Sequence, residues 1–423
     1  MQPGRGIRLL LPPFYGSADA ALGMGLSDLL GSCLERLTRV DVVMGREVFQ
    51  RVHWDARWRG LYIGEATELG RRLRAHVVLL VRYALNEDRL RYEVSVGDLQ
   101  GGTRWRQLPV SEEHWSEAHR IHLQLVREVF PLVDPPPLDS EERRVVTACG
   151  RPFPSQDALA LHGQARLQER KGETATNIYA RAAAASPGFA LPFFRQAKLF
   201  ERLGSRWRAA EAYRRVVRTD EDFVEAYKRL GDLLAKSPSR LFDQAVVAYQ
   251  TAVEVDPGYA EAYVGLGDAL AALGKVDGAV RAYRQGLSVD PWSVRAHVGL
   301  AKVYYTEKEL YHEAVAEYEK ALALDPTFVE AHYGFGDLLE EKGLYEEAIV
   351  RYRYVLDLEP RHTGALFAIA RAYEKVDVHE AIARWEHYLE VASELPSEKE
   401  WIDIARGHLE KLRRPNKEGS SVE

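Results

Sequence analysis

Two His-Glu pairs are the residues whose types most directly suggest metal chemistry in this chain. His312-Glu313 and His379-Glu380 each begin like the zinc-protease motif His-Glu-x-x-His, in which two histidines hold the metal and the glutamate acts as base. In both places the second histidine is replaced by an alanine, Ala316 or Ala383. Because each pair lacks a ligand, we expect neither to be a metal site.

Three more histidines fall on a helix predicted over residues 111–130, in which Ser111 is a plausible N-cap. His119 and His122 lie one turn apart, a spacing that could hold a metal ion. His122 also lies beside an apolar stripe, so a half-buried histidine is the favoured interpretation. The stripe consists of Trp115, Ala118, Ile121, Leu125 and Val129.

The pair Gly23-x-Gly25 lies between a predicted strand and a predicted helix, a context in which glycines can bring phosphate to a helix N-terminus. The third glycine of a dinucleotide fingerprint and the Gly-Lys-Ser/Thr of a P-loop are both missing. Close packing of a helix is therefore the favoured interpretation of these two glycines.

Residues 54–59 read Trp-Asp-Ala-Arg-Trp-Arg, an aromatic and arginine cluster. Trp and Arg are enriched at the hot spots of protein interfaces. Trp54, Arg57 and Trp58 are therefore a candidate interface, and a loop that covers a sheet is the alternative.

Charge and cysteine usage limit the classes of function. The net charge is −6, and residues 1–150 hold 20 Arg against 20 Asp plus Glu with no Lys, so no basic field exists for nucleic acid or an anionic membrane. All lysines lie beyond residue 150, which favours a domain boundary near that point. Cys33 and Cys149 are too few for a disulfide framework, and no apolar run approaches 18 residues. We expect a cytoplasmic protein.

The N-terminal elements must position the candidate residues named above, and their order predicts one α/β domain with an antiparallel portion. A turn at residues 86–88 is expected to join two of its strands. The expected strands are 6–14, 40–49, 76–84, 90–96 and 105–110, and the expected helices are 18–39, 65–73 and 111–130.

From about residue 190 the sequence repeats every 34 residues or so. Tyr263-x-x-Leu266-Gly267-x-x-Leu270 has counterparts that start at Tyr227 and His332, and each is followed by Ala, an aromatic residue, a small or apolar residue and often Pro. Such a period predicts helix-turn-helix units stacked into a solenoid. Gly267 is small where the two helices of a unit must approach closely.

This pattern resembles the tetratricopeptide repeat. We expect a right-handed all-α solenoid of about seven units after the α/β domain. The expected boundaries are 1–130 for the α/β domain, 131–157 for a Pro-rich linker, 158–396 for the repeats, 397–413 for a capping helix and 414–423 for a frayed tail.

The resemblance implies a concave groove lined by the first helix of each unit. The first lining row, the floor row, is Phe194, Lys228, Val264, Val298, Tyr333 and Phe367. The row one turn further, the charged row, is Lys198, Asp232, Asp268, Lys302, Asp337 and Arg371, and Tyr305 is added to these lining residues. An apolar floor beside alternating charge suits an amphipathic helix or an extended peptide. The alternative is an ordinary solvated helix face.

Relatives that grip the C-terminal carboxylate of chaperones use Asn and Lys in this groove. The clearly patterned repeats contain no Asn, so the resemblance does not extend to that clamp.

Parts of the first 130 residues resemble the N-terminal domain of TolB-like proteins, which also precedes tetratricopeptide repeats in bacterial regulators. The matching segments are 10–14, 25–30 and 68–79. The resemblance implies assembly at a strand edge or protein docking.

The sequence therefore predicts a non-enzymatic scaffold or adaptor that needs no cofactor and binds a protein or peptide partner in its groove. A signalling regulator is the alternative, with an N-terminal domain that senses a small ligand or nucleotide and repeats that form a homo-oligomer or transmit output. An enzyme would need a nucleophile-base pair or a metal set, and none is found in the sequence.

Overall fold

The structure is a computed structural model of the 423-residue chain. It describes residues 7–12, 14–16, 20–34, 40–43, 63–99, 103–129, 153–170, 174–237, 241–308 and 310–413. The candidate interface at Trp54, Arg57 and Trp58 lies outside the described residues, as do Cys149 and most of the Pro-rich segment. The chain forms two compact units, Met1–Tyr259 and Ala260–Glu423.

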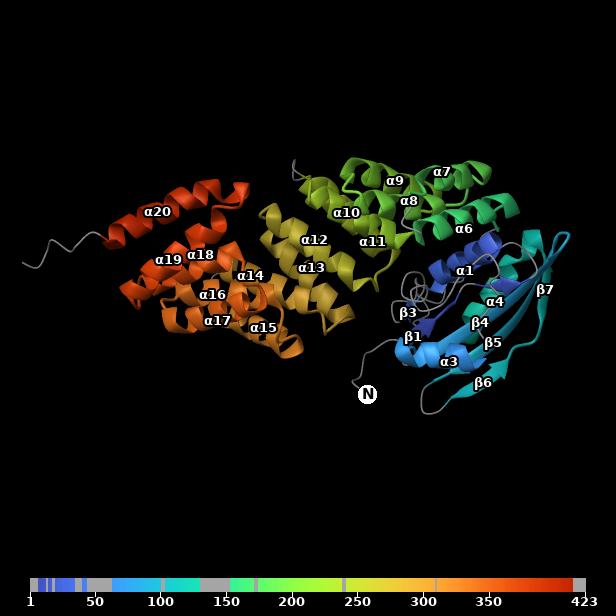
Figure 1. Ribbon diagram of the computed structural model, residues 1–423, viewed down its shortest axis with the longest axis horizontal. Coiled ribbons are helices and arrows are strands. Elements are labelled where there is room, and N and C mark those ends of the chain that lie inside the picture. Colours follow the sequence, from blue (N-terminus) through green and yellow to red (C-terminus); the bar gives the residue numbers. More distant parts are fainter. Residues whose placement is uncertain are drawn as a thin grey trace, which may run out of the picture. The chain divides into compact units, whose positions relative to one another are not determined.

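The first unit begins with an α/β domain built on one sheet (Figure 1). The strands are β1 (Ile7–Leu10), β2 (Tyr15–Gly16), β3 (Val40–Val43), β4 (Val77–Asn86), β5 (Arg89–Asp98), β6 (Arg104–Gln107) and β7 (Ser111–His114). The order along the sheet is β3-β1-β4-β5-β6, with β2 beside β4 and β7 beside β5. β1 pairs in parallel with β3 and β4, whereas β4, β5 and β6 pair antiparallel, so the expected antiparallel portion is confirmed.

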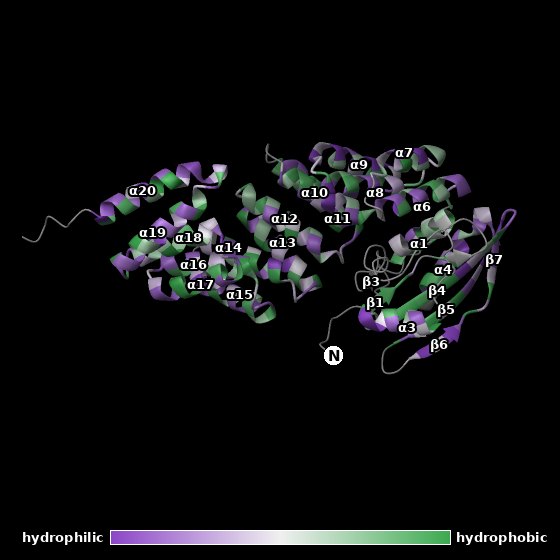
Figure 2. Ribbon diagram, viewed as in Figure 1, coloured by the Kyte–Doolittle hydropathy of each residue, from purple (hydrophilic) through white to green (hydrophobic). Residues whose placement is uncertain are grey.

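Helices cover both faces of this sheet because its central strands alternate apolar side chains between the two sides. Val78 and Leu80 of β4 face α3 (Ile63–Arg72) and pack with its Leu69. On the other face lie α1 (Ala20–Leu34) and α4 (His119–Val129). The hydrophobic colour of β4 and β5 in Figure 2, against the hydrophilic β6, marks the buried centre and the exposed edge of the sheet.

The helix predicted over 111–130 was wrong in its first turns. Residues 111–114 form β7, a short 3-10 turn follows at Trp115–Glu117, and α4 begins only at His119. Cross-strand pairing overrides the helical pattern here, because Glu112 lies opposite Arg91 in the register and its carboxylate accepts from Arg89 Nε at 2.7 Å. Ser111 is consequently not a helix N-cap.

Beyond residue 155 the described chain is a succession of helices that pack as antiparallel pairs. The helices of the first unit are α6 (Gln156–Arg170), α7 (Thr176–Ala185), α8 (Leu191–Arg202), α9 (Arg206–Thr219), α10 (Val224–Ala235) and α11 (Phe242–Val255). Those of the second are α12 (Ala260–Ala272), α13 (Val276–Val289), α14 (Val294–Lys308), α15 (Tyr311–Leu324), α16 (Val329–Glu341), α17 (Tyr345–Leu358), α18 (Thr363–Tyr373), α19 (Val378–Ala392) and α20 (Lys399–Arg413).

Two local features set the geometry of a pair. A Cβ added at Gly267 of α12 would lie 2.6 Å from the ring of Tyr283 on α13, so only glycine lets the two helices approach as they do. The sharp turn between them is made by Gly274, whose φ of 68° is unfavourable for residues with a Cβ. The expected close approach at Gly267 is therefore confirmed.

The α/β domain packs directly on the repeats within the first unit, through α1 and α6. A Cβ at Gly163 of α6 would lie 1.7 Å from the carbonyl oxygen of Ala21, and a Cβ at Gly25 would lie 2.4 Å from that of Leu159. The two helix backbones are therefore nearly in contact. Gly25 lies inside α1 and serves helix packing, which was the favoured interpretation.

A buried charge cluster crosses this contact. Asp28 of α1 is 1% exposed. Its carboxylate accepts two hydrogen bonds from Arg195 of α8, from Nε at 3.0 Å and from Nη2 at 2.7 Å. His162 of α6 lies 2.7 Å from the same carboxylate, and Arg166 lies 3.3 Å away. Burial alone would raise the pKa of Asp28, but these three partners hold it well below its usual value. The cluster ties the α/β domain to the first helix pairs.

The end of the Pro-rich segment also packs on the α/β domain. The Trp115 indole donates to the Pro154 carbonyl at 2.9 Å, and the Phe153 ring meets Trp115 edge-on at 5.6 Å.

In the second unit, α20 packs Ala405 and Leu409 against a cluster that includes Trp385.

Candidate groove on the repeats

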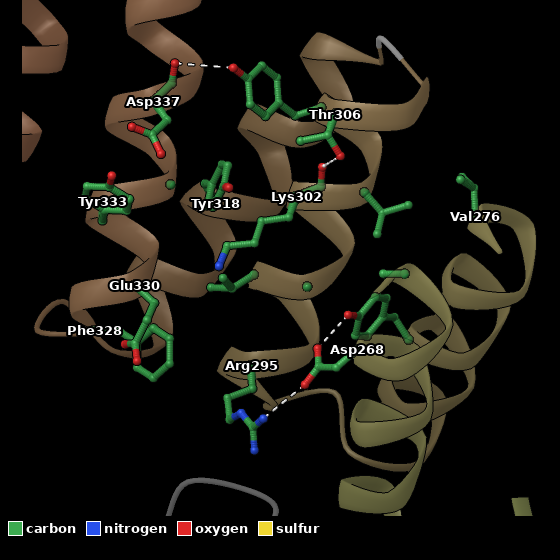
Figure 3. Close-up of a pocket in the computed structure, with 17 residues that line it drawn as sticks. Asp268, Val276, Arg295, Lys302, Thr306, Tyr318, Phe328, Glu330, Tyr333 and Asp337 are labelled. Atoms are coloured by element: carbon green, nitrogen blue, oxygen red, sulfur yellow. Dashed lines mark hydrogen bonds and ion pairs between the residues drawn. The ribbon is translucent and has the colours of Figure 1, made fainter. Parts of the chain in front are cut away.

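The second unit contains a cavity of about 590 Å³ between the first helices of three successive pairs, α12, α14 and α16 (Figure 3). Residues of α13 and α15 complete the wall. The lining residues are Asp268, Ala271, Val276, Tyr283, Arg295, Val298, Gly299, Lys302, Val303, Tyr305, Thr306, Tyr318, Phe328, Glu330, Tyr333, Gly334 and Asp337. The wall thus mixes aromatic rings with charged groups of both signs.

Six of the residues expected to face the groove line this one cavity. They are Asp268, Val298, Lys302, Tyr305, Tyr333 and Asp337. They come from three helices that are far apart in the sequence, and the 34-residue repeat aligns them on one side of the solenoid.

The remaining expected residues lie elsewhere. Phe194 is only 1% exposed, and its ring packs against Tyr213 and Phe223, so it is a core residue. Lys198 places its ammonium 5.4 Å from the Phe194 ring. Val264 is 3% exposed and belongs to the core of the second unit.

The other four make contacts inside the compact unit to which each belongs. Lys228 and Asp232 form an ion pair at 3.0 Å along α10. Phe367 packs edge-on against Trp385, Tyr388 and Trp401, and Arg371 pairs with Glu340 at 2.6 Å.

Asp268 forms one edge of the cavity, and two of its partners also belong to the wall. The Tyr283 hydroxyl donates to Asp268 Oδ1 at 2.6 Å, and Arg295 Nη2 donates to Oδ2 at 3.1 Å. Burial and this carboxylate raise the pKa of Tyr283, so its hydroxyl stays protonated and serves as a donor.

Asp337 lies on the opposite wall and is half-buried. Its Oδ1 accepts from the Tyr352 hydroxyl at 2.8 Å. Burial raises the pKa of this carboxyl above its usual value, with Glu340 adding to the effect. Burial and the nearby Asp337 also raise the pKa of Tyr333 to about 12, so this ring presents a neutral hydroxyl to the cavity.

Lys302 and Tyr318 are polar side chains of the wall without a hydrogen-bonded partner among the described residues. The Lys302 side chain reaches from α14 toward the α16 side of the cavity (Figure 3). Tyr318 of α15 is 1% exposed, yet its hydroxyl reaches the cavity past Gly334, where an added Cβ would lie 2.5 Å from it.

The tyrosines of the second helices, and the two glycines that let them reach the groove, were not predicted from the sequence. A Cβ at Gly299 would lie 2.4 Å from the Tyr283 ring, as one at Gly334 would meet Tyr318. Each glycine directly follows a floor-row residue, Val298 or Tyr333, and that recurring glycine is the sequence signal that could have revealed them.

The histidines considered for metal binding have other roles. His122 is buried, its Nε2 lies 2.9 Å from the Tyr92 hydroxyl, and burial lowers its pKa to about 3. The interpretation of His122 as a packed histidine is confirmed, with deeper burial than expected. His114 lies on β7 and does not share a helix with His119 and His122. Within the described residues, no group of three or more His, Cys, Asp or Glu side chains is placed to hold a metal ion.

In the part of the chain that the structure describes, no helix combines the length and apolar character that crossing a membrane requires.

Comparison with protein families identifies the repeats. A family model described as TPR repeat, for tetratricopeptide repeat, matches residues 242–274, 267–308 and 305–343. The match confirms tetratricopeptide repeats within residues 242–343, as predicted from the sequence. The match does not extend to the α/β domain, and its resemblance to TolB-like proteins stays a prediction.

Several solved structures resemble part of the chain. MamA protein is 26% identical over 41% of this chain and 92% of its own, with a TM-score of 0.35. YrrB, described as a TPR protein with an unusual peptide-binding site, is 19% identical over 45% of this chain and 96% of its own, with a TM-score of 0.36. PilF of Pseudomonas aeruginosa is 16% identical over 52% of this chain and 97% of its own, with a TM-score of 0.43. A comparison with curated proteins finds no match.

Proposed function

We propose that this protein is a non-enzymatic scaffold whose repeats bind a peptide segment of a partner protein in the cavity between α12, α14 and α16. Tetratricopeptide repeats typically mediate protein-protein interaction, and stacked repeats create extended concave surfaces for it. The observation that carries the proposal is this cavity of about 590 Å³, lined by aligned residues of three successive first helices.

The composition of the wall supports a peptide as the ligand. Val298, Tyr333 and Phe328 offer apolar and aromatic surface, which fits the side chains of a peptide. Tyrosine also supplies large contact area with little loss of conformational entropy on binding. Polar groups at the edges, such as Arg295 and Glu330, can fix the register of the peptide backbone.

A random peptide library tests the proposal and requires no identified partner. Twelve-residue peptides are selected on the full chain, synthesised with a fluorophore, and measured by fluorescence anisotropy. Replacing an interface aromatic residue by alanine commonly removes about 2 kcal/mol of binding, which is more than tenfold in affinity. We therefore expect Tyr333→Ala to weaken the selected peptides by about tenfold or more.

A matched variant serves as the control. Tyr354 of α17 is 47% exposed and lies outside the cavity, where its ring stacks on His332 at 4.5 Å. Tyr354→Ala should leave peptide affinity within about twofold, since isolated surface changes have small effects. Peptides that respond to Tyr354→Ala and ignore Tyr333→Ala would place the binding face elsewhere and contradict the proposal.

A further inference from the structure

A recurring hydrogen bond joins the two helices of almost every pair. In six pairs an aromatic side chain of the second helix donates to a carboxylate of the first helix, at 2.5 to 2.8 Å. We call these bonds the ring-to-acid ladder. Its members are Tyr179–Glu169, Tyr213–Glu201, Tyr249–Asp232, Tyr283–Asp268, Tyr352–Asp337 and Trp385–Glu374.

The acid of the ladder occupies one of two positions in the first helix. In α10, α12 and α16 it is the aspartate of the charged row: Asp232, Asp268 or Asp337. In α6, α8 and α18 a basic residue stands at that position, and a glutamate three residues later takes its place. These substitutes are Glu169 after Arg166, Glu201 after Lys198 and Glu374 after Arg371.

The pair α14/α15 has neither acid. Lys302 stands in the charged row, and the residue three positions later is Tyr305. The ring that should donate is Tyr318, which is 1% exposed and makes no hydrogen bond with any described residue. The Tyr305 hydroxyl is directed away to Glu341 of α16. One rung of the ladder is therefore missing, and it is missing inside the cavity.

We propose that a carboxylate of the bound peptide supplies the missing rung, accepting a hydrogen bond from the Tyr318 hydroxyl and pairing with the Lys302 ammonium. The inference rests on the proposed peptide-binding function of this cavity. The Tyr318 hydroxyl opens into the cavity and has no acceptor among the described residues, so a peptide carboxylate would replace water as its partner and form a charge-assisted bond. Lys302 adds a charge-assisted contact that an amide would not gain.

The neighbouring acids restrict the ligand to one negative charge. Three acids line the same cavity: Asp268 is paired with Arg295, whereas Asp337 and Glu330 form no ion pair with any described residue and would both repel an anion. Asp337 is already bonded to Tyr352, and Lys302 is the cation that can offset a single added carboxylate. A phosphate dianion would meet both acids with only Lys302 and the already paired Arg295 to balance it. An acidic side chain and a peptide C-terminus share the required chemistry.

The missing rung can be tested first in the free protein. Lys302→Asp installs the acid that Asp268 and Asp337 provide in neighbouring repeats. Tyr318→Phe should then lower the Tm of Lys302→Asp by about 3 to 6 °C, since a hydrogen bond to a charged acceptor is lost. In the wild-type background the same change should shift the Tm by less than about 1 °C. An equal loss in both backgrounds would show that the hydroxyl already has a partner, and would overturn the inference.

The peptide arm uses library peptides whose binding depends on Tyr333. In each peptide every Asp and Glu is changed singly to Asn or Gln, and the C-terminus is amidated in a separate peptide. One of these changes should reduce wild-type affinity about tenfold or more. The same change should have a smaller effect on Lys302→Met and on Tyr318→Phe, because each of these variants keeps one of the two partners, and less than a twofold effect on the double variant. A sensitive side chain identifies an internal acid as the ligand, and a sensitive C-terminus identifies the chain end.

The two levels of the proposal fail differently. Peptides that require Tyr333 but tolerate every acid-to-amide change would overturn the carboxylate and leave the groove function standing. If no selected peptide responds to Tyr333→Ala, the groove function falls, and the carboxylate falls with it.

Discussion

The contact between α1 and α6 leads to a sharp prediction for Gly163→Ala. A Cβ at this position would lie 1.7 Å from the carbonyl oxygen of Ala21 and 2.8 Å from the amide nitrogen of Gly25. Both neighbours are backbone atoms, so no side-chain rotation can relieve the overlap. The helices would have to separate by more than 1 Å, since real Cβ atoms essentially never approach a heavy atom within 3.0 Å.

The magnitude follows from two opposing terms. Overpacking a close contact costs about 1 to 3 kcal/mol, and a rigid backbone neighbour places this site at the upper end. Replacing a helical Gly by Ala recovers about 1 kcal/mol of helix propensity. Separation of the helices would also stretch the contact of His162 with Asp28, which is a buried pair at 2.7 Å. We expect a net loss of about 2 to 3 kcal/mol.

Gly407→Ala is the matched control, because α6 and α20 both have 15 residues and both glycines lie near the helix centre. A Cβ at Gly407 would meet nothing within 4 Å. Without an opposing contact, the substitution should stabilise α20 by about 0.5 to 1 kcal/mol. The same chemical change is therefore expected to have opposite signs at the two sites.

Urea unfolding followed by hydrogen exchange and mass spectrometry can assign each effect to its helix. Peptides from α1 and α6 should lose protection in Gly163→Ala, and peptides from α20 should gain it in Gly407→Ala. If both variants shift stability in the same direction, or Gly163→Ala costs less than about 0.5 kcal/mol, the close packing described above is refuted.

Three further variants test the packing of the two units. Arg195→Met leaves Asp28 buried without its bidentate partner and should cost about 3 to 5 kcal/mol in urea unfolding, whereas Arg120→Met, at an exposed pair, should cost less than about 1 kcal/mol. Because the pKa of His122 is about 3 when folded and near 6.5 when unfolded, the unfolded state binds the extra proton between these values. Stability should therefore fall as pH drops from about 6.5 toward 3, by about 2 kcal/mol at pH 4.5, and the urea midpoint of His122→Gln should depend less on pH over this range. Gly336→Ala would place a Cβ 2.5 Å from a tyrosine ring and should lower the Tm of the second unit, at a cost of about 1 to 3 kcal/mol.

The repeats were the most predictable part of the fold. Their apolar residues, glycines and prolines recur in register, and each helix pair is built from residues that are close together in the sequence. The α/β domain was predicted as a class, with its antiparallel strands, but not in its last elements. The local pattern at residues 111–114 favours a helix start, but these residues pair with β5, where Arg89 binds Glu112, and only the folded sheet brings that strand near. The contact of α1 with α6 was likewise invisible in sequence. Gly25 and Gly163 stand 138 positions apart, and nothing local links them.

Six of the residues expected to face the groove meet at one cavity, because the period of the repeat fixes which side of the solenoid a position faces. Phe194 was expected at the groove floor from its periodic position, but it is buried in the core. A periodic position specifies a direction on a helix, but the depth of burial depends on the neighbouring rings, here Tyr213 and Phe223. The tyrosines of the second helices were missed for the same reason. They reach the cavity only because glycines such as Gly334 remove the side chain that would cover them.

The charged row also has a different meaning from the one its alternation suggested. Most of its members are engaged within the fold: Asp232, Asp268 and Asp337 accept ladder bonds, and Arg371 pairs with Glu340. Charges that are already satisfied contribute little to the choice of a partner, since a ligand would have to displace an existing bond. Lys302 differs because α14 has an acid neither at its position in the charged row nor three residues later, where Tyr305 stands. In the proposed binding mode, the preference for a ligand is therefore carried by α14/α15, the described pair that lacks both acids, and that exception can be read from the sequence once the ladder is known.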